Sequence, residues 1–410
     1  MSPAVHVVTV GAGAVASPDP DGARVVGALA AAGVTVTARV FVDEDEPALE
    51  AALAGEGGLT VIVAGPGGSD GDVVRRVLAR VTGARLALND RMLAAIEDAH
   101  RKLDRAMPRR AERLALLPQG ATLWIVGGAE PAWALDTARG AFVVLPRGAD
   151  AALDATLHEQ LVPLARARLA GRPVAIVHTL KTAGVGVVEL EERLIDWLGA
   201  DRDVSVVVVP AEGEAWVRLR ARGATPADAA ERLAEAEPRI LAALGADCYG
   251  REGETLEQVV GALLKSRGLV VATAESCTGG LVGHRLTSVG GSSAYFERGV
   301  VVYSNAAKIE LLGVPESVLR AHGAVSGETA EAMARGVCAI ARTPCGLSIT
   351  GIAGPDGGTP AKPVGTVYIG VAVNDRVMSR RFRFSGDRAS IKWQSSSMAL
   401  DMLRRTLGGP

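Results

Sequence analysis

Short apolar runs alternate with helical segments along the first third of the chain, and this alternation constrains the fold more than any other feature. Val5–Val10, Val34–Val42 and Leu59–Ala64 have the length and β-branched content of buried strands, and Ala23–Ala32 has the pattern of a helix. Strands separated by helices pair in parallel, and ligands bind such sheets at the carboxyl ends of the strands. The sequence therefore predicts an α/β fold with a parallel sheet. Two further apolar runs are predicted to extend it: Ala121–Val126 and Phe142–Leu145.

Length and composition exclude several classes of protein. A chain of 410 residues, 48% of them hydrophobic, is long for one core and predicts two or three domains. A net charge of −2 and an aromatic content of 3% give no electrostatic or stacking basis for binding nucleic acid. The first residues lack a basic stretch followed by an apolar core, and no apolar run reaches membrane-spanning length. We expect a cytoplasmic protein with no membrane partner.

A smaller α/β unit is predicted after the first. Arg172–Leu180 and Val204–Val209 have strand patterns, Val188–Leu198 a helical pattern, and the alternating run Trp216–Ala221 predicts an edge or half-buried strand. The glycines between Gly245 and Gly253 predict a linker. An amphipathic helix then opens a third domain, with apolar positions at Leu256, Val259, Val260, Leu263 and Leu264.

The third domain contains a serine at a predicted strand-to-helix junction. Leu269–Ala272 is a buried-strand pattern, and apolar residues recur at helical spacing after Gly280, so Ser276 falls between the two elements. Helix-opening amides stabilise negative charge, which suits a nucleophile there. A helix cap at Ser276 or Thr278 explains the same pattern equally well.

A second segment favours the catalytic interpretation. Tyr303 ends an apolar run and Lys308 follows five residues later. Both side chains ordinarily titrate near pH 10, but an ammonium beside a phenol favours phenolate, and burial of a lysine favours the neutral amine. Together they can take a proton from a serine, as in lysine-assisted serine nucleophiles. Alternatively, Tyr303 only packs at a strand end and Lys308 is solvated.

Two later motifs suit a nucleotide. Thr350–Gly358 runs from a strand into a glycine-rich turn that would let backbone approach a ligand, although ordinary turn chemistry also accounts for it. Asp387 can cap the last helix and place Arg388 in its first turn as a phosphate contact. A solvated surface arginine is the competing interpretation of Arg388.

These segments occur in the order found in a known family. The chain resembles the C-terminal domain of the CinA family, the competence/damage-inducible proteins, over roughly residues 254–408. The motifs that carry the resemblance are Ala274–Gly280, Gly291–Gly299, Tyr303–Lys308, His322–Ser326, Thr350–Gly358, Lys362–Val367 and Gly386–Arg388.

The resemblance implies a nicotinamide mononucleotide deamidase that needs no metal or other cofactor. Ser276 matches the nucleophile of the family, and Tyr303 and Lys308 match its base pair. Amides near Thr278, Gly279 and Gly280 would hold the oxyanion. Further substrate contacts are expected at Ser293, Thr350, Gly351, Gly354 and Arg388. The resemblance also implies a homodimer acting on a small pyridine nucleotide. A nucleotide-binding accessory protein in DNA uptake or repair, without catalysis, is the alternative of a different class.

The first domain is similar to the molybdopterin-binding-like domain of full-length CinA proteins, which in some members hydrolyses ADP-ribose with a divalent metal. Here the first loop lacks the glutamate of the family. Asp70 and Asp72 remain as weak candidate metal ligands, so a divalent metal is expected only if this domain is active. The expected domains are residues 1–168, 169–248 and 254–410; the middle one is similar to the small KH-type domain of CinA proteins.

Overall fold

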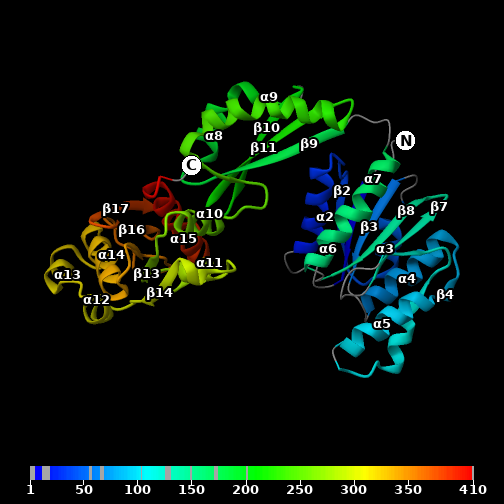
Figure 1. The fold of residues 1–410 in the computed structure, drawn as a ribbon, viewed down its shortest axis with the longest axis horizontal. Coiled ribbons are helices and arrows are strands. Elements are labelled where there is room, and N and C mark those ends of the chain that lie inside the picture. Colours follow the sequence, from blue (N-terminus) through cyan, green and yellow to red (C-terminus); the bar gives the residue numbers. More distant parts are fainter. Residues whose placement is uncertain are drawn as a thin grey trace. The chain divides into compact units, whose positions relative to one another are not determined.

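The computed structural model describes residues 5–11, 19–54, 58–64, 69–102, 104–124, 131–147, 150–169, 174–199 and 202–408. Tertiary contacts divide the chain into two compact units, one of residues 1–177 with 221–232 and the other of residues 178–220 with 233–410 (Figure 1). No helix in the described part of the chain is long and apolar enough to cross a membrane.

The first unit contains a six-stranded sheet in the order β2-β1-β3-β8-β7-β6. Its strands are β1 (Val5–Val10), β2 (Ala38–Val42), β3 (Gly58–Ala64), β6 (Thr122–Trp124), β7 (Ala132–Thr137) and β8 (Gly140–Pro146). Strands β2, β1, β3 and β8 are parallel, as the alternating pattern predicts. Strand β7 is antiparallel to β8, and β6 is antiparallel to β7. Strand β7 was not predicted. A second, two-stranded sheet joins β4 (Leu86–Leu88) to β5 (Leu116–Pro118).

Helices cover both faces of the six-stranded sheet. One apolar core lies against α2 (Pro20–Ala31), α6 (Asp150–Thr156) and α7 (Val162–Arg168), with a π-helical turn (Leu157–Leu161) between the last two. The other lies against α3 (Glu46–Ala52), α4 (Ser69–Thr82), α5 (Asp90–Lys102) and the 3-10 segment Arg109–Ala115. Figure 1 shows these two groups on opposite sides of the sheet. This is the doubly wound arrangement that buries a parallel sheet on both faces.

The middle sheet has the order β10-β11-β9-β12. Its strands are β9 (Val174–Thr182), β10 (Val204–Ala211), β11 (Glu214–Gly223) and β12 (Cys248–Arg251), with helices α8 (Val187–Arg193) and α9 (Pro226–Leu244) and the 3-10 turns Ile195–Trp197 and Gly245–Asp247. Trp216–Ala221, predicted to be an edge or half-buried strand, is the half-buried kind, because β11 alternates between buried and exposed residues and lies inside the sheet. The predicted linker contains β12, which pairs antiparallel with β9. A four-residue strand that includes a glycine is too short to give a periodic signal.

The third domain is a five-stranded sheet in the order β14-β13-β15-β16-β17. Its strands are β13 (Val271–Glu275), β14 (Phe296–Val301), β15 (Cys345–Gly351), β16 (Thr366–Val373) and β17 (Arg376–Arg383). Strand β13 is parallel to both of its neighbours, whereas β16 and β17 are antiparallel. The carboxyl ends of β14, β13 and β15 therefore meet at one edge, where a ligand site is expected.

Helices also cover both faces of this sheet. On one face, a core forms with α10 (Leu256–Ser266), α11 (Leu281–Thr287) and α15 (Arg388–Thr406). On the other, a core forms with α12 (Asn305–Leu312), α13 (Glu316–His322) and α14 (Gly327–Ala341); a 3-10 turn (Ser292–Ala294) precedes β14. The predicted cap at Asp387 is confirmed, because Asp387 accepts from the Ser390 amide; Ser326 caps α14 in the same way by accepting from the Thr329 amide. The alternative of a cap at Ser276 or Thr278 is not confirmed, because the residue before α11 is Gly280, which has no capping side chain.

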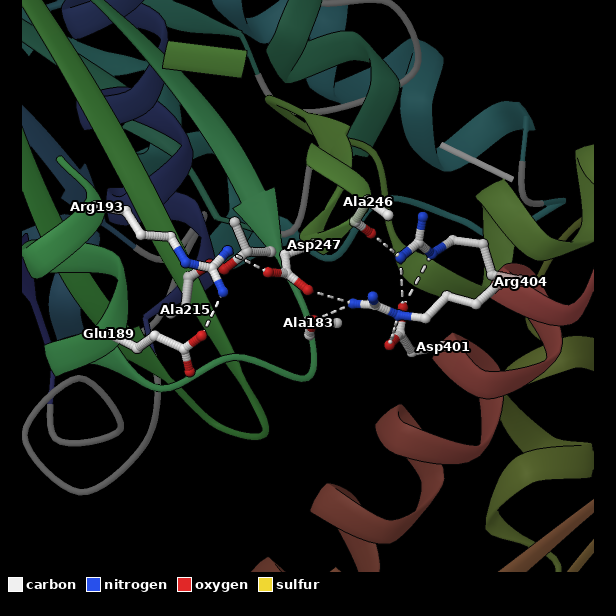
Figure 2. A network of polar contacts seen from close by, with 10 residues as sticks. Ala183, Glu189, Arg193, Ala215, Ala246, Asp247, Asp401 and Arg404 are labelled. Carbon is white, nitrogen blue, oxygen red and sulfur yellow. Dashed lines mark hydrogen bonds and ion pairs between the residues drawn. The ribbon is translucent and has the colours of Figure 1, made fainter. Parts of the chain in front are cut away.

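The middle sheet and α15 are joined by a chain of ion pairs. Asp401, almost fully buried, pairs with Arg404 and Arg405, and Arg405 pairs in turn with Asp247, which also binds Arg193 (Figure 2). The arginines further donate to the carbonyls of Ala246 and Ala183. Nearer the start of α15, the Trp393 indole donates to the carbonyl of Glu212. The middle domain is thus held along most of the length of α15.

Candidate active site

Ser276 and Lys308 meet at the carboxyl edge of the third-domain sheet. Ser276 directly follows β13, and its amide continues the ladder by donating to the Ile349 carbonyl of β15. Lys308 lies in α12, whose first turn is capped by Ser304. The Nζ of Lys308 is 3.1 Å from the Oγ of Ser276. The helix cap fixes where α12 begins and so brings the lysine back over the strand end.

Burial makes Lys308 an unusual lysine. Its side chain is 1% exposed, and its Nζ also donates to the carbonyls of Val302 (2.9 Å) and Tyr303 (3.2 Å). Desolvation by burial lowers the pKa of the Lys308 amine, because charge is costly away from water. A neutral amine has two N–H donors and one lone pair. The two carbonyls can accept from these donors while the serine hydroxyl faces the lone pair; a protonated amine would donate to all three groups.

Tyr303 contributes differently from Lys308. It lies beyond β14, its side chain is 63% exposed, and its backbone carbonyl accepts from Lys308. Its phenol oxygen accepts a hydrogen bond of 3.0 Å from Arg388, whose other terminal nitrogen donates to the Gly354 carbonyl. Within the described residues, the phenol makes no hydrogen bond to Ser276 or Lys308. Arg388 therefore joins Tyr303 to the glycine-rich loop, a contact that the sequence did not predict.

Glu275 is a site residue that sequence reasoning missed. Its carboxylate is buried and accepts from the amides of Gly280 (3.0 Å), Val282 (3.1 Å) and Gly283 (2.8 Å). Those are the free donors at the start of α11, which a carboxylate satisfies well. An acid at the end of a mostly apolar strand, four residues before the glycine pair Gly279-Gly280, was the available signal. Glu275 fixes the turn that carries Ser276.

The turn itself requires glycine and uses some of the predicted oxyanion donors. Gly279 and Gly280 have φ of +62° and +96°, which other residues rarely adopt. The Gly279 amide donates to the Ser276 carbonyl, and the Gly280 amide donates to Glu275. In the described part of the chain, the amides of Cys277 and Thr278 donate to no other residue. They are the donors that remain beside Ser276.

Cys277 is packed as an apolar side chain and does not compete with Ser276. It lies in the apolar core of the third domain, and burial raises the pKa of its thiol to about 12. The thiolate, which is the nucleophilic form, is therefore scarce. Next to it, the hydroxyl of Thr278 is buried and has no partner among the described residues.

The other predicted contacts are only partly brought together. Gly354 accepts from Arg388 and so borders the site. The Thr350 hydroxyl instead donates to the Ala324 carbonyl, and Gly351 lies tightly against Val367. Both residues therefore make structural contacts within the domain. Ser293 is exposed in a 3-10 turn before β14 and makes no described contact with Ser276 or Lys308.

Of the two candidate metal ligands in the first domain, only Asp72 has a described side chain, and it is engaged in ion pairs. The carboxylate of Asp72 accepts a hydrogen bond from Arg75 and forms an ion pair with Arg113, so both of its oxygens already have positively charged partners. The side chain of Asp70 and the loops at 12–18 and 65–68 lie outside the described residues. Among the described side chains, no group of three or more His, Cys, Asp or Glu is arranged to hold a metal ion.

Comparison with known proteins matches three family models to successive parts of the chain. The CinA C-terminal domain matches residues 253–407, the damage-inducible protein CinA KH domain residues 177–250, and the probable molybdopterin binding domain residues 6–167. A CinA-like protein of Geobacter sulfurreducens is 38% identical over 95% of both chains, and one of Geotalea uraniireducens is 35% identical over 95% of this chain and 93% of its own. The crystal structure of competence/damage inducible protein CihA from Agrobacterium tumefaciens is 40% identical, with a TM-score of 0.36, and covers 37% of this chain and 93% of its own. The chain belongs to the CinA family.

Proposed function

We propose that the third domain hydrolyses the carboxamide of nicotinamide mononucleotide to the carboxylate and ammonia. The observation that carries this proposal is the buried contact of 3.1 Å between Lys308 Nζ and Ser276 Oγ. Burial lowers the pKa of Lys308 and so makes its amine easier to use as a base, and a serine hydroxyl within hydrogen-bonding reach of a base is an activated nucleophile. A protein that only binds nucleotides needs neither. The choice of substrate rests on the motifs shared with the CinA family.

In this mechanism the neutral amine of Lys308 accepts the proton of Ser276 as Oγ attacks the carboxamide carbon. The two carbonyls that accept from Nζ stabilise the ammonium that forms. The oxyanion is stabilised by the amides of Cys277 and Thr278; loss of one such donor typically costs about 3 kcal/mol of barrier. The C–N bond then breaks and ammonia leaves with a proton from Lys308. Water then attacks the acyl carbon as it gives a proton to Lys308, and Lys308 passes this proton to Oγ as the bond between the acyl carbon and Oγ breaks, which releases the acid and the free serine.

We propose that Tyr303 acts on the substrate side of this pair. Its exposed phenol is held by Arg388, and its carbonyl is one of the two acceptors for Lys308. The phenol oxygen accepts from Arg388 and the phenol O–H donates a hydrogen bond to the carboxamide, which orients the substrate, while Lys308 gives the leaving ammonia its proton. Tyr303 then assists Lys308 as a member of the catalytic pair.

The test is ammonia release from nicotinamide mononucleotide by the full chain, with EDTA present to remove trace metals. Ser276→Ala should lower kcat by several orders of magnitude, because the nucleophile is lost. Ser292→Ala, a serine at the start of an exposed 3-10 turn, is the matched control. No release by the wild-type protein would leave Ser276 as a structural turn residue and favour the binding-protein alternative.

A further inference from the structure

Two positive side chains at the start of α15 reach the rim of the Ser276 turn. Arg388 and Lys392 are four residues apart and therefore share a helix face. Arg388 contacts Tyr303 and Gly354. The Nζ of Lys392 is 3.7 Å from the position that a Cβ on Gly279 would take. Gly279 is exposed and three residues beyond the nucleophile, so Lys392 borders the open side of the turn.

Lys392 has no counter-charge. Two other lysines of this domain have hydrogen-bond partners. Lys308 has three, and Lys362 donates to the carbonyls of His322 and Val325. Within the described residues, Lys392 makes no hydrogen bond or ion pair, although it is only partly exposed. Its neighbour Gly279 has no side chain that could occupy the space beside the amine. An unpaired, partly desolvated cation beside a nucleophile suits an anionic part of the substrate.

We propose that Lys392 is a specificity residue that binds the phosphate of the substrate together with Arg388. This inference rests on the proposed function and adds to it a requirement for a phosphate monoester. Arginine binds phosphate through a planar fork of donors, and lysine binds it as a point charge. With the carboxamide at Ser276, a nucleoside monophosphate carries its dianion one ribose away, within reach of the flexible lysine. A nucleoside or the free amide lacks the phosphate that Lys392 would bind.

The experiment compares two substrates that share the amide and the ribose. Lys392→Gln should raise KM for nicotinamide mononucleotide about tenfold or more, the loss typical of a charge-assisted contact, with a smaller change in kcat. The same variant should leave the already poor hydrolysis of nicotinamide riboside unchanged. Lys392→Arg, which keeps the charge, should recover most of the affinity.

Arg376→Gln is the matched control. Arg376 is an exposed cation on β17 that pairs with Val373, which itself faces Cys345 at the start of β15. It therefore lies at the end of the sheet opposite to Ser276, and its loss removes one positive charge from the domain without touching the site. This variant should keep the wild-type KM for both substrates.

Binding separates this inference from the proposed chemistry. Calorimetry on Ser276→Ala, with and without Lys392→Gln, measures affinity for nicotinamide mononucleotide and for the riboside without turnover. Affinity for the phosphorylated ligand should fall selectively in the double variant. An equal loss for both ligands, or no loss, would overturn the role of Lys392. Wild-type protein that binds the mononucleotide through Lys392 but releases no ammonia would overturn the proposed reaction and leave the phosphate contact standing.

Discussion

Lys308 is the residue on which the proposed chemistry depends most directly. Among the described residues, its hydrogen-bond partners are two carbonyls and one hydroxyl. None of these partners is a carboxylate that would stabilise the positive charge of a protonated lysine. Burial also removes the amine from water, and this desolvation lowers the pKa of Lys308. In the proposed reaction Lys308 therefore serves as the base.

The pH dependence of the reaction should report the titration of Lys308. Only the neutral amine can accept the serine proton, so kcat/KM should rise with pH through a pKa below the ordinary lysine value of about 10.4. Activity is lost as the pH falls through that value. The measurement is kcat/KM for ammonia release across the pH range, and Lys308→Met should abolish activity throughout.

Tyr303→Phe distinguishes the two members of the pair. The variant should lower kcat but keep the acidic limb of the profile, because Lys308 remains. If the acidic limb of the pH profile is absent in Tyr303→Phe, the limb depends on the phenol of Tyr303. That result would contradict our account of Lys308.

At the scale of secondary structure, the start of α11 depends on a single side chain. Glu275 provides acceptors for three amides and is continuous with the strand that precedes Ser276. Strand, turn and helix are thus joined by backbone and carboxylate bonds. The nucleophile is placed by a rigid junction.

Glu275→Gln should loosen this junction. A glutamine side chain has one acceptor oxygen, so at least one of the three amides loses its partner, at a cost of about 1–3 kcal/mol. Hydrogen exchange in residues 276–287 should accelerate, and kcat should fall more than KM changes. Glu297→Gln, which removes an exposed carboxylate paired with Arg298, is the control. Unchanged exchange in α11 would show that Glu275 does not hold the turn.

Much of this architecture could be predicted from the sequence, and the failures have physical reasons. The buried runs at β1, β3 and β13 and the caps at Ser326 and Asp387 are local signals, so they were predictable. β12 and the interior position of β11 depend on pairing between distant segments, which leaves no periodic trace. Likewise, the sequence favours Ser276 and Lys308 as reactive residues, but the hydrogen bond from Arg388 to Tyr303 appears only after folding.

At the scale of the whole molecule, α15 connects the candidate site to the middle domain. Its first turns carry Arg388 and Lys392, and its last turns carry Asp401 and its arginines. Burial alone would raise the pKa of Asp247, but hydrogen bonds from Arg405 and Arg193 outweigh burial and leave that pKa lowered. This contribution to stability is present above the ordinary aspartate pKa and is lost as the pH falls through the lowered value.

Asp401→Asn should destabilise this unit strongly. Removing one member of a buried ion pair leaves a buried arginine uncompensated, which typically costs about 3–5 kcal/mol. The melting temperature of the full chain should fall accordingly. Glu316→Gln, in an exposed pair with Arg320, should change it little, since such pairs contribute about 0–1 kcal/mol. Equal melting temperatures for the two variants would contradict a structural role for the buried network.

The segment from Gly245 to Thr255 determines how the molecule can be divided. Glu252 exchanges hydrogen bonds with Thr179, Lys181 donates to the Glu254 carbonyl, and the Tyr249 side chain belongs to the apolar core of the third domain. Proteases need a stretch of chain that can open locally, and this stretch is bonded throughout. A fragment that begins at Gly253 would lack Tyr249 and leave a cavity in the apolar core of the third domain. A fragment that begins at His178 would keep Tyr249 in that core.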